Sequence, residues 1–223
     1  MAGNMKAVKL RIKSVQSTMQ ITKAMELVAS SKLRKAKERA ETCRPYFTEL
    51  HETLKDIARE NIDFSSVYAR ESSNPRYCYV AIAGDRGLAG GYNANLFKCL
   101  EAAAEGKDYV VLPIGKKAVE YFRQRGIECL TDKFAEIADI SVADCFEIAN
   151  LLCEEFRKGT FGHIELCYTV FASMLSQQPE VFSVLPMTDI REESGGRVAT
   201  RSEEHTSELQ SHHDLVCRLL LEK

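Results

Sequence analysis

The chain has 223 residues, of which 45% are hydrophobic and 28% charged, and its net charge is −2. This balance suits a soluble protein with a sizeable core and one or two domains. The sequence contains no run of about 18 apolar residues, which excludes a membrane-spanning helix, and its amino terminus lacks the apolar h-region of a secretory signal. Eight cysteines are scattered without a CxxC pair. That pattern favours buried, reduced thiols over a disulfide framework or a zinc site.

The first quarter of the chain carries a long heptad pattern. In alternating steps of four and three from Val8 to Ile57, thirteen of fifteen positions are apolar, and the exceptions are Thr22 and Glu26. A straight helix drifts by about 20° per heptad against such a repeat, so a stripe of this length indicates a supercoil with another helix. Pro45 lies inside the pattern, and because the stripe resumes at Phe47 we expect a bend there and not an end.

Charge is distributed unevenly along the chain. Residues 1–40 hold ten Lys or Arg and two acids, a net charge of +8, and because the whole chain carries −2 the remainder carries −10. A basic rod on an acidic body predicts that the rod meets an acidic partner, either a nucleic acid or an acidic protein. The other interpretation is a solvated helix face. Met25 and Val28 lie off the heptad stripe, which indicates a rod contacted from outside as well as paired inside.

Residues 62–76 lose the helical period and read as a linker. Beyond them, strands alternate with helices, which predicts an α/β domain with a mainly parallel sheet. We expect strands at Tyr77–Ala83, Tyr109–Ile114, Ile164–Phe171 and Val181–Pro186, a short strand at Ile127–Leu130, and helices at Asn93–Glu105, Lys116–Arg125 and Val142–Arg157. Asp139 or Ser141 is the expected cap of the last helix.

A glycine-rich turn follows the first expected strand, at the place where α/β domains bind nucleotides. Its spacing, G-x-x-G-x-x-G-G from Gly84 to Gly91, fits neither the dinucleotide fingerprint nor the P-loop. The alternative is that the glycines permit a tight turn while Asp85 and Arg86 make local or partner contacts. No acid pair and no Ser/His/Asp set is held by a recognisable motif, so the sequence predicts no catalytic, cofactor or metal site.

Two longer motifs resemble one family. ITKAMELVASSKLRKA, preceded by KSVQST, is similar to the amino-terminal helix signature of the gamma subunit of F-type ATP synthases, and GDRGLAGGYNANLF resembles the glycine-loop signature of that family. The resemblance runs from residue 1 to about residue 200. Ala89 stands where the family often has cysteine.

The resemblance implies a non-catalytic rotor. Its amino-terminal helix would pair with a carboxyl-terminal helix as a shaft inside a ring of alpha and beta subunits, and an α/β foot domain would hold the epsilon subunit and the membrane c-ring. Proton flow would turn the shaft at the cytoplasmic face of a bacterial plasma membrane, and the chain would touch the membrane only through the complex. By the same resemblance, the residues facing the catalytic ring are Lys23, Met25, Lys32, Arg34 and Lys35. The foot-domain loop comprises Gly84, Asp85, Arg86, Gly87, Gly90, Gly91 and Asn93.

The end of the sequence departs from the family pattern. RSEEHTSELQS, from Arg201, resembles the translation of a common sequencing-library adapter, and DLVCRLLLEK resembles its far end. We therefore expect a non-native tail, with the partner helix of the shaft missing, and a chain that does not drive coupled rotation as written. The alternative is a short natural amphipathic helix.

The sequence therefore predicts a shaft helix at 1–61, a linker at 62–76, a Rossmann-like three-layer α/β foot domain at 77–195, and a loop with a tail at 196–223. Two other functions stay open. One is a basic coiled coil that binds nucleic acid, whose affinity would fall steeply with salt. The other is a nucleotide-dependent enzyme built on the α/β domain.

Overall fold

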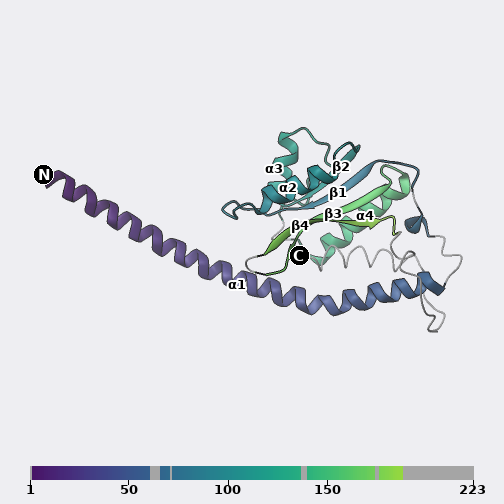
Figure 1. Ribbon diagram of the computed structural model, residues 1–223, viewed down its shortest axis with the longest axis horizontal. Coiled ribbons are helices and arrows are strands. Elements are labelled where there is room, and N and C mark those ends of the chain that lie inside the picture. The colour runs from purple at the N-terminus through teal and green to yellow at the C-terminus, as the bar shows by residue number, and fades with distance from the viewer. Residues whose placement is uncertain (1, 61–65, 71, 137–139, 174–175, 188–223) are drawn as a thin grey trace. The chain divides into compact units, whose positions relative to one another are not determined.

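The computed structural model describes residues 2–60, 66–70, 72–136, 140–173 and 176–187 (Figure 1). The tail expected after residue 200, and with it the question of the missing partner helix, lies outside these residues and stays a prediction. The same holds for Asp139 as a helix cap. None of the helices in the described part of the chain is long and apolar enough to cross a membrane.

The first helix, α1, runs from Ala2 to Glu60 and contains 59 residues, which corresponds to a length of about 90 Å. It includes the whole heptad pattern and continues past Pro45, as predicted. Thr18 and Thr22 donate hydrogen bonds from their hydroxyls to the carbonyls of Ser14 and Thr18, at 3.1 and 3.0 Å. The polar residue on the stripe, Thr22, therefore has its hydroxyl paired within the helix.

The chain divides into two compact units, Met1–Pro45 and Tyr46–Lys223. The division falls at the one proline inside α1. Proline removes a backbone donor and clashes with the preceding turn, so a helix is mechanically weakest there. The bend expected at Pro45 remains a prediction, because the two units are described separately.

A four-stranded sheet forms the centre of the second unit, with the order β2-β1-β3-β4. Its strands are β1 (Tyr77–Ile82), β2 (Tyr109–Ile114), β3 (His163–Phe171) and β4 (Gln177–Leu185). β1 pairs in parallel with both β2 and β3, whereas β4 is antiparallel to β3. The prediction of a mainly parallel sheet is confirmed.

Two strands differ from the sequence prediction. β4 begins at Gln177 and not at Val181, because the polar residues before Val181 pair with the end of β3. The short strand expected at Ile127–Leu130 is reduced to a single bridge between Cys129 and Val111. Both differences arise from pairing with a neighbouring strand, which hydrophobic pattern does not encode.

Helices cover both faces of this sheet (Figure 1). α2 (Tyr92–Ala103) and α3 (Lys116–Gln124) lie on one face, and α4 (Val142–Lys158) lies on the other. Alternation along β1 supplies both cores: Val80 packs on the α4 side, while Tyr79 and Ala81 pack on the other side. The three-layer, Rossmann-like architecture predicted from the sequence is therefore confirmed.

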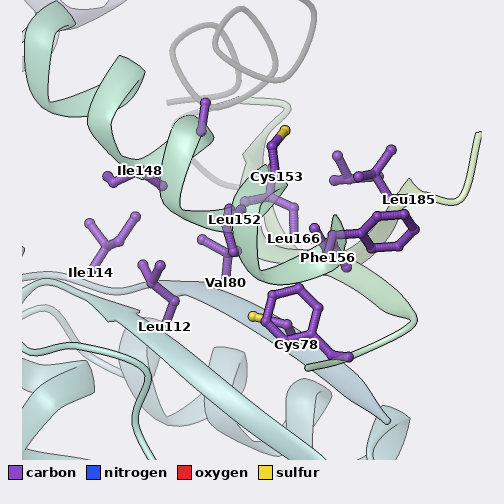
Figure 2. Close-up of a cluster of buried hydrophobic side chains, with 14 of the residues drawn as sticks. Cys78, Val80, Leu112, Ile114, Ile148, Leu152, Cys153, Phe156, Leu166 and Leu185 are labelled. Atoms are coloured by element: carbon purple, nitrogen blue, oxygen red, sulfur yellow. The ribbon is translucent and has the colours of Figure 1, made fainter. Parts of the chain in front are cut away.

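The core beneath α4 shows how the layers are joined. Figure 2 shows Ile148, Leu152 and Phe156 of α4 within the same buried cluster as the side chains of Val80 and Leu112 in the sheet. Leu152 is 1% exposed and Leu112 is fully buried. Each such side chain contributes about 1.5–3 kcal/mol relative to an exposed position, so this cluster joins α4 firmly to the sheet.

A short strap lies before β1, within the segment that the sequence predicts as a linker. A 3₁₀ turn, η1 (Val67–Ala69), buries Tyr68, whose ring stacks on Phe156 with 6.0 Å between centroids. The backbone N–H of Met187, just after β4, donates to the Tyr68 carbonyl at 2.8 Å. The chain segments that lead into and out of the sheet are thus hydrogen-bonded to each other.

Candidate subunit-contact site

The five shaft residues identified by resemblance, Lys23, Met25, Lys32, Arg34 and Lys35, all lie on α1 and are all exposed. They do not share one face of the helix. With about 3.6 residues per turn, Met25 and Lys32 lie above one another, with Lys35 one turn beyond. Lys23 and Arg34 lie above one another on the opposite side. A partner that touches all five must therefore approach α1 from two sides.

Exposed apolar side chains also follow two sides of this helix. Val8, Ile12, Val15 and Met19 follow the heptad stripe and are 48–63% exposed. Leu10, Ile21 and Val28 form a second stripe on the opposite side, at 58–63% exposure. Contiguous exposed apolar stripes of this kind mark surfaces that contact another chain or segment, so the structure favours a helix that is contacted on two faces.

Arg34, one of the basic residues on α1, forms a weak ion pair within the helix. Arg34 Nε lies 3.7 Å from the Glu38 carboxylate, one helical turn away, with both side chains largely exposed. An exposed pair of this spacing contributes about 0.3–0.5 kcal/mol. A contact of this strength would not prevent Arg34 from pairing with an acidic group on another protein.

The base of the glycine loop is fixed by backbone and side-chain contacts. Gly84 donates its N–H to Asn93 Oδ1 at 2.9 Å, and its carbonyl accepts from the Lys117 N–H at 3.2 Å. Asp85 Oδ1 accepts from the backbone N–H of Lys116 at 3.1 Å. Lys116 is the first residue of α3, so the Asp85 carboxylate sits at the positive end of that helix. The structure thus brings Gly84, Asp85 and Asn93 together.

The apex of the loop projects into solvent. Arg86, Gly87, Gly90 and Gly91 are all exposed, and the Leu88 side chain between them is 98% exposed. Leu88 has φ +63°, a left-handed conformation that costs about 1–2 kcal/mol outside glycine, and Gly90 has φ +59°. A large apolar side chain held in an unfavourable conformation at the tip of a fixed loop is well suited to contact another protein.

This arrangement does not suit phosphate binding. The Asp85 carboxylate occupies the helix N-terminus beside the loop, where it would repel an anionic group. Among the described residues, no group of three or more His, Cys, Asp or Glu is placed to hold a metal ion. The geometry therefore favours the interpretation of the loop as a contact element over the nucleotide-binding alternative.

Sequence reasoning missed two parts of this site. It did not single out Leu88, although a leucine surrounded by glycines in a turn is a detectable signal. It also gave no role to Gly115, which follows β2 at the same sheet edge and has φ +96°. A Cβ at Gly115 would overlap the Ala83 carbonyl, so glycine is required for the close approach of the two segments.

The buried thiols of the α/β domain are held in their protonated form. Burial raises the pKa of Cys78 and of Cys167 well above the ordinary thiol value. Since the thiolate is the reactive species, these cysteines behave as small apolar core residues. No disulfide links the cysteines that the structure describes.

The sequence of this chain is similar to those of known proteins along most of its length. The family model described as ATP synthase matches residues 4–223. The ATP synthase gamma chain of Ruminococcus albus is 48% identical over 194 residues, which cover 84% of this chain and 67% of that relative. The sodium-ion-specific ATP synthase gamma chain of Acetobacterium woodii is 35% identical over 204 residues, covering 91% and 68%.

A solved structure shares the fold. The Tetrahymena thermophila mitochondrial ATP synthase central stalk with its c-ring contains a chain that matches with a TM-score of 0.62 at 18% identity, covering 91% of this chain and 90% of that one.

A long, exposed helix and a loop projecting from a three-layer domain define a subunit of a larger assembly. The chain belongs to the ATP synthase gamma subunit family, the central stalk of F-type ATP synthases. The family predicted from the two sequence motifs is thereby confirmed.

Proposed function

We propose that the natural protein with this sequence up to about residue 200 is a non-catalytic rotor subunit that couples ion flow through a membrane ring to ATP synthesis in a surrounding alpha and beta ring. The exposed apolar and basic faces of α1 carry this proposal, because they require partners on more than one side. Rotation would present these unequal faces in turn to the catalytic sites. Each site would then change state through its differential contacts with the shaft.

The partners follow from the same surfaces. Lys23, Met25, Lys32, Arg34 and Lys35 would contact the alpha and beta subunits, with the basic residues opposite acidic groups. The α/β domain would hold the epsilon subunit and the c-ring, at the cytoplasmic face of a bacterial plasma membrane. We propose that protons are the coupling ion. The Acetobacterium relative is named sodium-ion-specific, so members of the family differ in the ion named for them.

The glycine loop serves, in this proposal, as a contact of the α/β domain with another subunit of the complex. Its fixed base and its exposed Leu88 support this assignment. The nucleic-acid alternative gains no support from the family to which the chain belongs. That alternative predicts that DNA binds the basic helix at low salt. If no binding is detected when DNA is titrated into the chain at low salt, the alternative is excluded.

The proposed contact of α1 with the catalytic ring is tested by charge reversal. The chain with Lys32→Glu, Arg34→Glu and Lys35→Glu is co-expressed with alpha and beta subunits, and the amount that copurifies is measured at two salt concentrations. Reversing three charges that face acidic groups is expected to reduce recovery at least about tenfold at low salt. The loss should shrink as salt screens the charges.

A matched control lies on the same helix. Lys9→Glu, Arg11→Glu and Lys13→Glu change the net charge by the same amount outside the matched segment. If both triple variants reduce copurification with the alpha and beta subunits equally, the attraction is non-specific. The assignment of residues 23–35 as the ring contact would then be wrong.

A further inference from the structure

We infer that the hydrogen bond from the Lys116 backbone N–H to Asp85 is a latch that positions the loop apex, so that Asp85 is a positioning residue for the contact made by Leu88. The inference rests on the proposed role of the loop. Asp85 is half-buried at the base, whereas every residue from Arg86 to Gly91 is exposed. The apex therefore depends on its base for its position.

Three features place the latch at the junction of two segments far apart in sequence. The Asp85 carboxylate is joined to Lys116 across 31 residues, at 3.1 Å. The next amide, of Lys117, donates to the Gly84 carbonyl at 3.2 Å. Gly115 supplies the close approach, because any side chain there would overlap the Ala83 carbonyl. The start of α3 thus acts as a fixed support for the loop that follows β1.

The donor in this latch is well defined. Lys116 is the first helical residue, so its N–H has no partner within α3. An ionised carboxylate that accepts from such an N–H is favoured further by the positive end of the helix. On the other side of the base, Asn93 Oδ1 holds the Gly84 N–H. The exposed segment between these two anchors includes Leu88 in its left-handed conformation.

Trypsin cleavage tests this hydrogen bond, because trypsin cleaves after arginine and Arg86 follows Asp85 directly. The rate of cleavage between Arg86 and Gly87 is measured in the full chain by mass spectrometry, with the exposed bond between Arg125 and Gly126 as the internal reference. Asp85→Ala is expected to increase cleavage after Arg86 about tenfold, the effect of losing one charge-assisted hydrogen bond. Cleavage after Arg125 should stay unchanged.

A second pair of variants removes the donor instead of the acceptor. Lys116→Pro deletes the N–H at the first position of a helix, where proline is well tolerated, and it should reproduce the tenfold rise. Lys116→Ala keeps the N–H but removes the side chain, including its ion pair with Glu136 at 2.6 Å, and should cleave at the original rate. The double variant Asp85→Ala with Lys116→Pro should show no further rise, since both changes remove the same bond.

Three results would overturn the inference. The Lys116→Pro variant could be cleaved after Arg86 at the original rate, or the Lys116→Ala variant could be cleaved as fast as Lys116→Pro. The increases caused by Asp85→Ala and Lys116→Pro could also multiply in the double variant. A separate variant tests the proposed function: Leu88→Ala should leave cleavage after Arg86 unchanged but reduce recovery of the complex. If the Leu88→Ala chain assembles fully while Asp85→Ala and Lys116→Pro still increase cleavage after Arg86, the loop is not part of the interface. The hydrogen bond between Lys116 and Asp85 would then still position the loop.

Discussion

Burial decides the chemistry of individual cysteines in this chain. Cys43 lies exposed on α1, whereas Cys78 and Cys167 are fully buried in the α/β domain. Desolvation penalises the thiolate and raises the pKa of both buried thiols. The sequence interpretation of the cysteines as buried thiols therefore holds for these two and fails for Cys43, which is exposed on the apolar stripe of α1.

This difference predicts selective alkylation. Treatment of the folded chain with iodoacetamide at pH 8 should modify Cys43 at least about a hundredfold faster than Cys78, because Cys78 reacts only after local unfolding. Peptide mass mapping after short exposures measures both rates. In concentrated urea the two rates should converge, and similar rates in the folded chain would contradict the buried position of Cys78.

Helix α4 is defined at its start by a reciprocal cap. The Ser141 side chain accepts from the Asp144 N–H at 3.3 Å, and Asp144 Oδ2 accepts from the Ser141 N–H at 2.8 Å. Gly159, in a left-handed conformation at φ +77°, ends the helix. These local signals explain why the predicted and observed helices agree to within one residue.

Removing the cap should weaken the domain. We expect Ser141→Ala to lower the free energy of unfolding by about 1 kcal/mol, measured by urea denaturation, because an N-terminal amide of α4 loses its acceptor. Ser141→Asn keeps an acceptor and should lie within a few tenths of the original value. Equal losses in both variants would show that the hydroxyl has another role.

The same cap predicts a pH effect. Hydrogen bonds from the Ser141 hydroxyl and N–H hold the pKa of Asp144 below its ordinary value. A carboxyl with a lowered pKa stabilises the fold above its unfolded pKa, and this contribution is lost as the pH falls through the lowered value. Ser141→Ala should therefore raise the pKa of Asp144, which a carbon NMR titration of its carboxyl detects; an unchanged pKa would contradict the assigned cause.

At the scale of the whole molecule, the described core of the α/β domain is formed within one stretch of the chain. Both core clusters lie between Tyr68 and Met187. The strap at Tyr68 and the residue after β4 are joined by a backbone hydrogen bond. Among the described residues, contacts within this range therefore make a large contribution to the stability of the sheet and its three covering helices.

A fragment of residues 66–187 should accordingly unfold in one cooperative transition, with a free energy within the usual range of about 5–15 kcal/mol. Circular dichroism in urea measures this. A fragment of residues 77–187 lacks the buried Tyr68 ring and should be less stable by about 3 kcal/mol. Non-cooperative melting of the longer fragment would show that the domain depends on α1.

The sequence by itself determined the long helix, the order of strands and helices, and the family, because each depends on local periodicity or on contiguous motifs. The heptad stripe from Val8, the buried strand at Tyr109–Ile114 and the cap at Ser141 all carry their signal within a few residues. The five shaft residues remain a prediction, made by resemblance from one continuous motif.

Only the tertiary structure decided how distant segments meet. The start of β4 at Gln177 depends on its pairing with β3, and the loop base depends on Lys116 lying beside Asp85. Pairing between strands and support between loops are set by packing over long sequence separations, and no local pattern records them.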